Sequence, residues 1–314
     1  MELRQLGRSG LAVPPIIFGG NVFGWTADKA MSFRLLDALV EHGLNAIDTA
    51  DVYSAWVSGH RGGESETVIG EWLKARGRRN DVLILTKCGM VMPDGKGLSA
   101  AWIARAVEDS LHRLGIETID LYQAHRDDEA TPLEETLGAF AKLIQQGKVR
   151  AIGASNYSAA RFRAALETSA RLGLPRFETM QPHYNLVERG IEADLLPLCR
   201  ERGVGVIPYY SLAAGFLSGK YRKAEDFAKT ARGQRGIGRY LDARGEKVLA
   251  ALDAQAARLG ASQAEVALAW LKAKPGVTAP IASATSLAQL EGLARAARLT
   301  LDAEAMAALD AASA

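Results

Sequence analysis

Cysteine is scarce in this chain of 314 residues, since only Cys88 and Cys199 occur. Two thiols form at most one disulfide and offer no metal-ligand spacing, so a disulfide scaffold and a bound metal are not expected. Excess charge is also lacking, because 38 Lys and Arg face 36 Asp and Glu. Such a balance supplies no field that would attract nucleic acid or an anionic membrane, and we expect neither as a partner.

Long apolar runs are missing as well. The longest, such as Gly203 to Tyr209, have the length of a β-strand and cannot span a bilayer. No basic segment followed by an apolar run opens the sequence, so we expect a cytoplasmic protein with reduced thiols. The motif Gly-x-Gly-x-x-Gly occurs nowhere, which argues against a doubly wound dinucleotide-binding sheet.

What the sequence does contain is a regular alternation of strand and helix patterns. Hydrophobic residues make up 48% of the chain, enough for a large core. Each expected strand is followed by a helical segment, and eight such units predict an α/β chain folded as a closed (β/α)8 TIM barrel. The expected strands are Ile16–Phe18, Ala46–Asp48, Val82–Lys87, Ile119–Ala124, Val149–Ala154, Phe177–Gln181, Val204–Tyr209 and Val277–Ala282.

Segments at both ends add to this barrel. The turn at Gly7-Arg8-Ser9-Gly10 predicts an N-terminal β-hairpin, and the Ala-rich segment from Leu301 predicts an extra C-terminal helix on the outside. No break in composition marks a second domain, so residues 1–314 are expected to form one. The irregular stretch from Tyr221 to Arg244 is rich in Lys, Arg and Gly, and loops of this length are usually functional. The sequence has no apolar stripe that stands out as exposed, so it predicts no particular oligomeric state.

Ionisable residues end three successive strands: Asp48, Lys87 and His125. In a barrel of this kind the carboxyl ends of the strands meet at one mouth, where active sites lie. Taken one at a time, these residues could equally have a structural role. Asp48 and Lys87 would then form a structural ion pair, and His125 would only bond to a backbone group. With Tyr53 just beyond Asp48, the set together favours a catalytic function.

These four residues suit the reduction of a carbonyl group. A tyrosine hydroxyl has a pKa of about 10, and a nearby ammonium lowers it. Lys87 can supply that ammonium, Asp48 can hold Lys87, and Tyr53 can then donate a proton to a developing alkoxide. His125 can hydrogen-bond the same oxygen. No side chain supplies hydride, so the reaction requires a nicotinamide cofactor.

Polar residues beyond the later strands suit that cofactor. Ser155, Asn156 and Gln181 can bond a carboxamide, and Tyr209 can stack on the nicotinamide ring. Gly215, Gly219 and Lys220 can hold a pyrophosphate through backbone N–H groups and charge. The basic loop that follows can add charge from Arg222, Lys223, Arg232, Arg235 and Arg239. Ser283 and Thr285 precede a helix whose N-terminus can bind a phosphate.

The sequence resembles the aldo-keto reductase family over nearly its whole length. The resemblance rests on the segments at 43–53, 63–70, 85–87, 119–125, 147–156, 181–185 and 215–221. It implies a (β/α)8 barrel, NAD(P)H-dependent carbonyl reduction and a catalytic tetrad of Asp48, Tyr53, Lys87 and His125. The cofactor positions that it implies are Ser155, Asn156, Gln181, Tyr209, Leu212, Gly215, Leu217, Gly219, Ser283, Thr285 and Gln289. We also expect Tyr210, Ser211 and Lys220 to contact the cofactor.

Three departures from the family pattern bear on the cofactor. One is Leu293, where many relatives have an Asn near the adenine. Where relatives often read Tyr-Ser-Pro-Leu, this chain has Tyr209-Tyr210-Ser211-Leu212, and the register favours Tyr209 over Tyr210 as the stacking ring. Many relatives carry Lys or Arg at the position of Thr285, where it grips the 2′-phosphate of NADP. We expect NADPH to be preferred by a reduced margin, with NADH usable.

The substrate pocket is expected to be aromatic. Trp25 and Trp56, with Arg126 beside His125, suit a small carbonyl compound with an apolar body, although the tryptophans can also simply cover the barrel mouth. Two other functions stay open. One is a Schiff-base lyase or aldolase that uses Lys87, and the other is a non-catalytic cofactor-binding subunit, as some relatives are.

Overall fold

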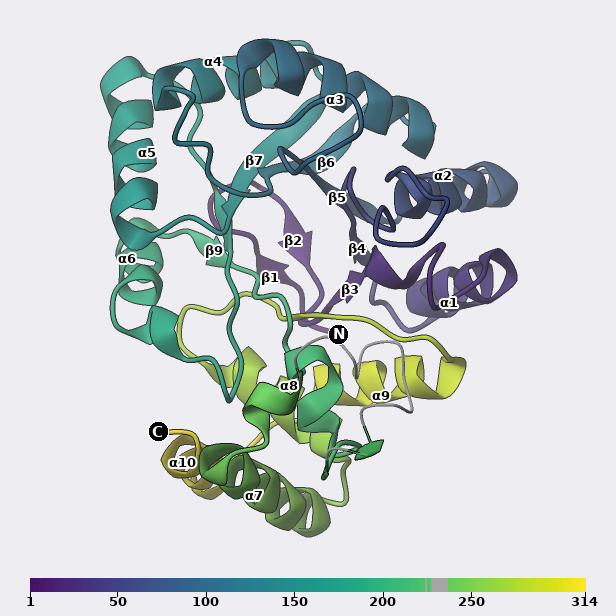
Figure 1. Cartoon of the computed structure of the whole chain (residues 1–314), viewed down its shortest axis with the longest axis vertical. Coiled ribbons are helices and arrows are strands. Elements are labelled where there is room, and N and C mark those ends of the chain that lie inside the picture. Colours follow the sequence, from purple (N-terminus) through teal and green to yellow (C-terminus); the bar gives the residue numbers. More distant parts are fainter. Residues whose placement is uncertain (224, 227–236) are drawn as a thin grey trace.

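The computed structural model describes residues 1–223, 225–226 and 237–314 (Figure 1). Its main sheet has eight parallel strands in the order β10-β3-β4-β5-β6-β7-β8-β9. The predicted (β/α)8 barrel is confirmed. The strands are β3 (Ile17–Gly19), β4 (Ala46–Asp48), β5 (Leu83–Cys88), β6 (Ile119–Ala124), β7 (Val149–Ser155), β8 (Thr179–Gln181), β9 (Gly205–Val206) and β10 (Ile281–Ala282).

The barrel closes between its last two strands. Val206 bridges to Val277 in parallel fashion, the Thr278 amide donates to the Val206 carbonyl over 2.8 Å, and the Ile281 amide donates to the Pro208 carbonyl over 2.9 Å. Both strands are shorter than the runs predicted at 204–209 and 277–282. Pro208 and Pro280 explain the difference, because proline has no N–H to donate to a neighbouring strand.

Helices follow the strands as the sequence pattern predicts, and many begin at an N-cap side chain. Asp28, Ser99 and Ser158, for example, each accept a hydrogen bond from the third amide of the helix that follows. The helices that cover the barrel are α1 (Lys29–Glu41), α2 (Glu64–Arg76), α3 (Ala100–Leu114), α4 (Leu133–Gln145), α5 (Ala159–Leu172), α6 (Leu195–Arg202), α8 (Gln263–Ala273) and α9 (Leu287–Arg298).

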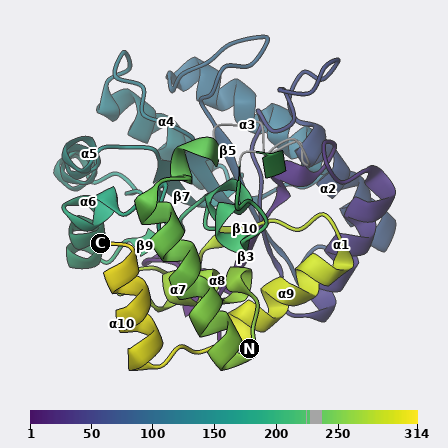
Figure 2. The same ribbon diagram turned by 60° about the horizontal axis from the view of Figure 1, so that its bottom comes forward.

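Two further helices lie outside this ring. They are α7 (Ala243–Leu259) and α10 (Ala303–Ala312), which pack side by side, with α7 also against α8 (Figures 1 and 2). Asp302 caps α10 by accepting from the Ala305 amide, at the helix start that the sequence predicts. The expected C-terminal helix is therefore confirmed, and α7 adds a second one to that layer.

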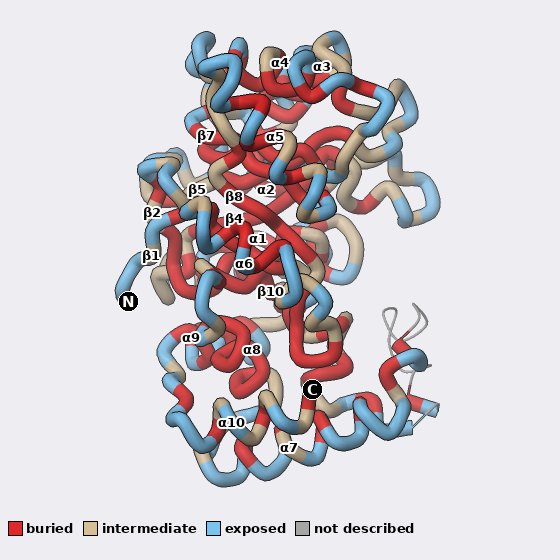
Figure 3. Tube along the Cα trace, turned by 90° about the vertical axis from the view of Figure 1, so that its left-hand side faces the viewer, coloured by how far each residue is buried: buried red, intermediate tan, exposed pale blue. Residues whose placement is uncertain are grey.

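The N-terminal hairpin closes the amino end of the barrel. Strands β1 (Arg4–Gln5) and β2 (Ala12–Val13) pair in antiparallel fashion. Leu6, Leu11 and Val13 are buried and belong to an interior cluster with inward side chains of the strands, such as Leu85 and Leu121. Figure 3 shows the strands buried within the shell of helices. Because this end is filled with apolar side chains, the interior is open to polar groups only at the carboxyl ends.

Close contact between two helices leaves no room for a side chain at Gly70. A Cβ on Gly70 in α2 would come within 2.2 Å of the Arg113 carbonyl oxygen at the end of α3, whereas one on Gly138 in α4 would meet nothing within 4 Å. The first neighbour is backbone, which cannot rotate away.

We therefore expect Gly70→Ala to destabilise the protein by about 1–3 kcal/mol despite the better helix propensity of alanine. Gly138→Ala is the matched control and should stabilise it by about 0.5–1 kcal/mol. Urea unfolding of both variants measures the two changes. Equal stabilisation in both would show that the α2–α3 contact is looser than the structure has it.

Candidate active site

A buried lysine lies at the centre of the carboxyl end of the barrel. The Lys87 side chain, on β5, is fully buried, and its Nζ donates to Asp48 Oδ2 over 2.6 Å. It also donates to the Thr49 carbonyl over 2.7 Å and to the Tyr53 hydroxyl over 3.0 Å. An ammonium has three donors, so each is satisfied by protein. Strands β4 and β5 are neighbours in the sheet, which is why residues 39 positions apart in sequence meet here.

The second oxygen of Asp48 is bound from the opposite side. Gln181 Nε2 donates to Asp48 Oδ1 over 2.9 Å, and Gln123 Nε2 does so over 3.3 Å. Sequence reasoning missed Gln123, which is fully buried and pairs with Lys87 in the β5–β6 register. Its signal was available, because a polar residue two positions before His125 occupies the same face of the strand as Leu121. Gln181 therefore supports Asp48, in addition to its predicted place near a cofactor.

Burial and charge set the protonation states of this group. Burial lowers the pKa of Lys87, but the Asp48 carboxylate and Tyr53 outweigh it and leave that pKa above its ordinary value. Burial raises the pKa of Tyr53 above 10.0, and the Lys87 ammonium offsets only part of the shift. The expected lowering of the Tyr53 pKa is thus wrong. Loss of hydration around the phenolate exceeds the attraction of one ammonium that Asp48 already neutralises.

His125 lies against the same tyrosine. Its ring centroid is 5.9 Å from that of Tyr53 in an edge-to-face arrangement, and its amide donates to the Cys88 carbonyl over 2.8 Å. Burial and the nearby charges of Lys87 and Arg126 hold the pKa of His125 well below 6.5, so the ring is neutral at pH 7. Its Nδ1 atom is buried and has no hydrogen-bond partner among the described residues. All four members of the predicted tetrad therefore lie together.

A chain of hydrogen bonds links the tetrad to the residues predicted for the nicotinamide. Ser155 Oγ donates to the Gln181 carbonyl over 2.8 Å. Asn156 Nδ2 donates to the His125 carbonyl over 2.9 Å and to Ser155 Oγ over 3.0 Å. The Tyr209 hydroxyl donates to Asn156 Oδ1 over 2.7 Å. Tyr209 is half-buried and belongs to this chain, whereas Tyr210 is 55% exposed.

Residues predicted for the pyrophosphate and the 2′-phosphate lie in two nearby segments. Ser211 is buried, and its hydroxyl donates to the Ile281 carbonyl over 2.8 Å, which joins the ends of β9 and β10. The turn that follows holds the buried Leu217 and the half-buried Leu212, Gly215 and Gly219 before the exposed Lys220. At the start of α9, Ser283 donates to Asn21 Oδ1, and the Thr285 amide and hydroxyl both donate to Gln289 Oε1 over 2.8 and 3.1 Å.

Part of the basic loop is engaged elsewhere. Arg222 pairs with Asp253 at 2.8 Å, and Arg239 pairs with Glu188 at 3.1 Å. Both guanidinium groups therefore have acidic partners in this structure, and their contribution of charge to a phosphate stays a prediction. Arg232 and Arg235 lie outside the described residues.

Aromatic rings cover the tetrad on one side. The Trp56 ring centroid lies 5.9 Å from that of Tyr53 and 5.6 Å from that of Trp25. The two tryptophans predicted for the substrate therefore form a continuous wall that ends on Tyr53. Arg126 follows His125 and is exposed at the same rim.

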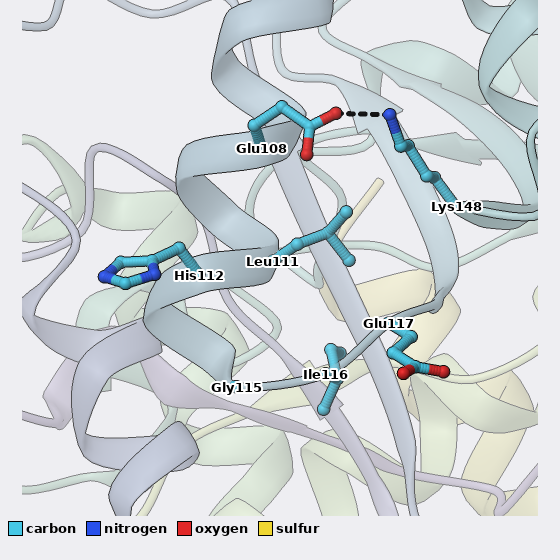
Figure 4. Close-up of a pocket in the computed structure, with 7 residues that line it drawn as sticks. All are labelled: Glu108, Leu111, His112, Gly115, Ile116, Glu117 and Lys148. Carbon is cyan, nitrogen blue, oxygen red and sulfur yellow. Dashed lines mark hydrogen bonds and ion pairs between the residues drawn. The ribbon is translucent and has the colours of Figure 1, made fainter.

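A surface hollow at the other end of the barrel is separate from this site. Glu108, Leu111, His112 and Lys148 are among its lining residues, and Glu108 pairs with Lys148 (Figure 4). The hollow lies at the C-terminus of α3, where the chain enters β6. It is therefore at the amino end of the strands, away from Lys87.

The profile of the Aldo/keto reductase family matches residues 15–314. The chain belongs to this family. It is 34% identical to "Uncharacterized oxidoreductase YrpG" of Bacillus subtilis (strain 168) over 97% of this chain and 93% of the relative. It is also 34% identical to "Aldo-keto reductase AMT2" of Alternaria alternata, over 96% and 88% of the two chains. A third relative, "Probable voltage-gated potassium channel subunit beta" of Arabidopsis thaliana, is 32% identical over 93% and 89%.

Membership makes this aldo/keto reductase an oxidoreductase of a family that reduces small carbonyl compounds with nicotinamide cofactors. No helix in the described part of the chain has both the length and the apolar character needed to cross a membrane.

A second group of buried charges lies behind the tetrad of this aldo/keto reductase, and sequence reasoning did not single it out. Glu66 on α2 is fully buried and accepts from Arg113 Nε over 2.7 Å and from Thr86 Oγ1 over 2.5 Å. Asp51, two residues before Tyr53, is 2% exposed. Burial and the Glu66 carboxylate raise the pKa of Asp51 to about 8, although Arg113 and Lys87 act in the opposite direction. The carboxyl of Asp51 is therefore mostly protonated at neutral pH.

This raised pKa couples stability to pH. In the unfolded chain Asp51 ionises near its ordinary value of 3.8, whereas in the folded protein it does so only near 8. The unfolded state is favoured increasingly as pH rises between these values, and the effect is constant above them. The substitution Asp51→Asn removes this pH-dependent contribution to stability, because asparagine does not ionise.

We expect Asp51→Asn to raise the free energy of unfolding by about 2–5 kcal/mol at pH 8 and to leave it unchanged at pH 4. Guanidinium unfolding at both pH values measures the difference. The exposed residue Asp109 supplies the control, Asp109→Asn, which should show no such difference. A gain that is the same at both pH values would mean that Asp51 is ionised in the fold.

Proposed function

We propose that the protein reduces an aldehyde or ketone to the alcohol, reversibly, with hydride from a nicotinamide and the proton from Tyr53. The observation that carries this proposal is the position of Lys87 Nζ, which is buried and bonded to both Asp48 and the Tyr53 hydroxyl. A carboxylate, an ammonium and a phenol in contact form a proton donor whose conjugate base is stabilised when the proton leaves.

Each group has one task in this scheme. Tyr53 is a neutral phenol before the reaction because its pKa is raised, so it holds the proton that it must give. The Lys87 ammonium stabilises the phenolate that remains, and Asp48 keeps Lys87 charged. Neutral His125 can donate a hydrogen bond to the carbonyl oxygen and orient it. In the oxidation of an alcohol, the same tyrosine takes the proton back.

The residues on the rim fit a nicotinamide nucleotide, which supplies hydride when bound. Ser155, Asn156 and Gln181 offer amide and hydroxyl groups beside the tetrad, and Tyr209 offers a ring whose hydroxyl is fixed. The start of α9 offers backbone N–H groups to a phosphate. The hydroxyls of Ser283 and Thr285 can join them by exchanging their present bonds to Asn21 and Gln289.

The aromatic wall supports a carbonyl compound with an apolar body as the substrate, because Trp25, Trp56 and Tyr53 form a continuous apolar surface. Arg126 at the rim can meet a polar end of that substrate. A screen of aldehydes, ketones and alcohols with NADPH and NADH, followed by nicotinamide absorbance, tests the activity. That residues 1–314 form one domain stays a prediction, and so does the cytoplasmic location of the protein.

The alternatives are less well supported. A Schiff base needs a free amine, but Lys87 is held as an ammonium with all three protons bonded. The similarity to proteins named as probable potassium channel β subunits favours a non-catalytic subunit. Against it, a structural protein has no need for a proton donor coupled to a buried ion pair.

We expect Tyr53→Phe to lower carbonyl reduction by about 10² or more, because the ring stays and the proton donor is lost. Cofactor affinity, measured by fluorescence titration, should be unchanged. Trp56→Phe is a control that alters the aromatic wall without removing the donor. Turnover of Tyr53→Phe near that of the unmutated enzyme would transfer the donor role to another residue, with His125 the nearest.

We expect the enzyme to prefer NADPH by a modest margin, because Thr285 offers a hydroxyl where a guanidinium would offer charge and two hydrogen bonds. Thr285→Arg should tighten NADPH binding by about tenfold, leave NADH binding unchanged and change turnover little. Ala303→Arg, on α10, controls for added charge. If the unmutated enzyme clearly favours NADH, α9 does not bind a 2′-phosphate.

A further inference from the structure

Three aromatic rings gather where the chain leaves strands β8 and β9. His183 and Tyr209 are directly paired by a parallel bridge, and the Tyr209 amide donates to the Pro182 carbonyl over 3.0 Å. Paired residues of neighbouring strands present their side chains on the same face. The two rings are stacked, with centroids 5.3 Å apart and planes inclined by 17°. Tyr210 meets both rings at steep angles.

The orientation of the His183 ring is set by a buried asparagine. Asn185 is fully buried, its Nδ2 donates to the Tyr210 carbonyl over 2.9 Å, and its Oδ1 accepts from the Val187 amide over 2.9 Å. These two backbone partners fix which side of the amide is nitrogen. The same Nδ2 lies 3.3 Å from His183 Nε2. Because an amide nitrogen only donates, His183 Nε2 must accept, and the proton of the neutral ring is on Nδ1.

The electrostatic environment agrees with a neutral ring. Burial lowers the pKa of His183, and Arg239 adds to this, while Glu188 opposes it. The ring that stacks on Tyr209 is therefore a flat, uncharged surface at neutral pH.

Tyr209 is consequently held at three places. His183 covers one ring face, Tyr210 contacts its edge, and Asn156 accepts its hydroxyl proton over 2.7 Å. Asn156 is itself bonded to the His125 carbonyl. A tyrosine confined in this way has little rotational freedom left to lose when a ligand packs on its remaining face.

We propose that His183 is a positioning residue, which stacks on Tyr209 and holds that ring in the orientation that packs on the nicotinamide. The proposal rests on the proposed function, because it takes Tyr209 as the stacking residue. Nothing in it requires His183 to touch the cofactor or the substrate. Its effect should therefore appear at the nicotinamide end of the nucleotide and be absent at the adenine end.

The test compares two variants of His183 with the same set of nucleotides. His183→Leu keeps the approximate size but removes the flat ring, and His183→Phe keeps a ring that can stack but cannot accept from Asn185. The probes are whichever of NADPH and NADH binds more tightly, and the nicotinamide-free fragments 2′,5′-ADP and 5′-ADP. Dissociation constants come from calorimetry, folding is checked by circular dichroism, and His112→Leu on the surface of α3 is the control.

We expect His183→Leu to weaken dinucleotide binding by about three- to tenfold, the usual worth of one aromatic pair. His183→Phe should restore affinity to within about twofold. Neither change should alter binding of the fragments. In a Tyr209→Leu background, His183→Leu should have no further effect, because the ring that it positions is gone.

Several results would overturn the proposal. Unchanged dinucleotide affinity in His183→Leu would overturn this inference alone and leave the proposed function intact. An equal loss for the dinucleotide and the fragments, or an equal loss in His183→Phe, would assign His183 a general structural role instead. If the unmutated protein binds no nicotinamide dinucleotide at all, the proposed function fails, and this inference fails with it.

Discussion

The buried ion pair between Asp48 and Lys87 is the interaction on which the rest of the site depends. Both side chains are at most 1% exposed, so neither charge is hydrated. A buried pair survives only when its remaining hydrogen-bonding groups are also satisfied, and removing one partner typically costs about 3–5 kcal/mol. Here Thr49, Gln123 and Gln181 complete the bonding around the pair. The polar interior at the carboxyl end of the barrel follows from this requirement.

Burial and the pair together set the protonation states of Tyr53 and His125. Burial raises the pKa of Tyr53 against the pull of the Lys87 ammonium, so the phenol keeps its proton. Burial, followed by the charges of Lys87 and Arg126, lowers the pKa of His125 and keeps that ring neutral. The site thus holds one positive charge, neutralised by Asp48, and two uncharged groups that can face a carbonyl oxygen. At the opposite end, the hairpin closes the barrel with the buried apolar side chains of Leu6, Leu11 and Val13.

Outside the tetrad, the structure supports the mouth of the barrel from two sides. Behind β4, the Glu66–Arg113 pair joins α2 to α3 close to Asp51, which begins the turn to Tyr53. Across the mouth, Asn156 and Tyr209 join the ends of β7 and β9 through a single hydrogen bond. Each support connects residues of different strands or helices, so the geometry of the mouth depends on the closed barrel as a whole.

The barrel and its hairpin could be predicted from the sequence alone, and so could the four residues of the tetrad, which the structure brings together. Strand-length apolar runs ending in Asp48, Lys87 and His125 can be recognised locally, because each residue contrasts with the run that precedes it. The limits of β9 and β10 followed from Pro208 and Pro280, which could also be read locally.

Only the tertiary structure decided which side chains meet across strands. Gln123 bonds to Asp48, which lies 75 positions away in the sequence. His183 stacks on Tyr209, and the two residues follow different strands that are neighbours in the sheet. Arg222 and Arg239 proved to be paired with acidic residues of other segments. The direction of the Tyr53 pKa shift was also decided at this level. Burial is the sum of everything that packs around a group, and a sequence pattern contains the charges but not the water that folding removes.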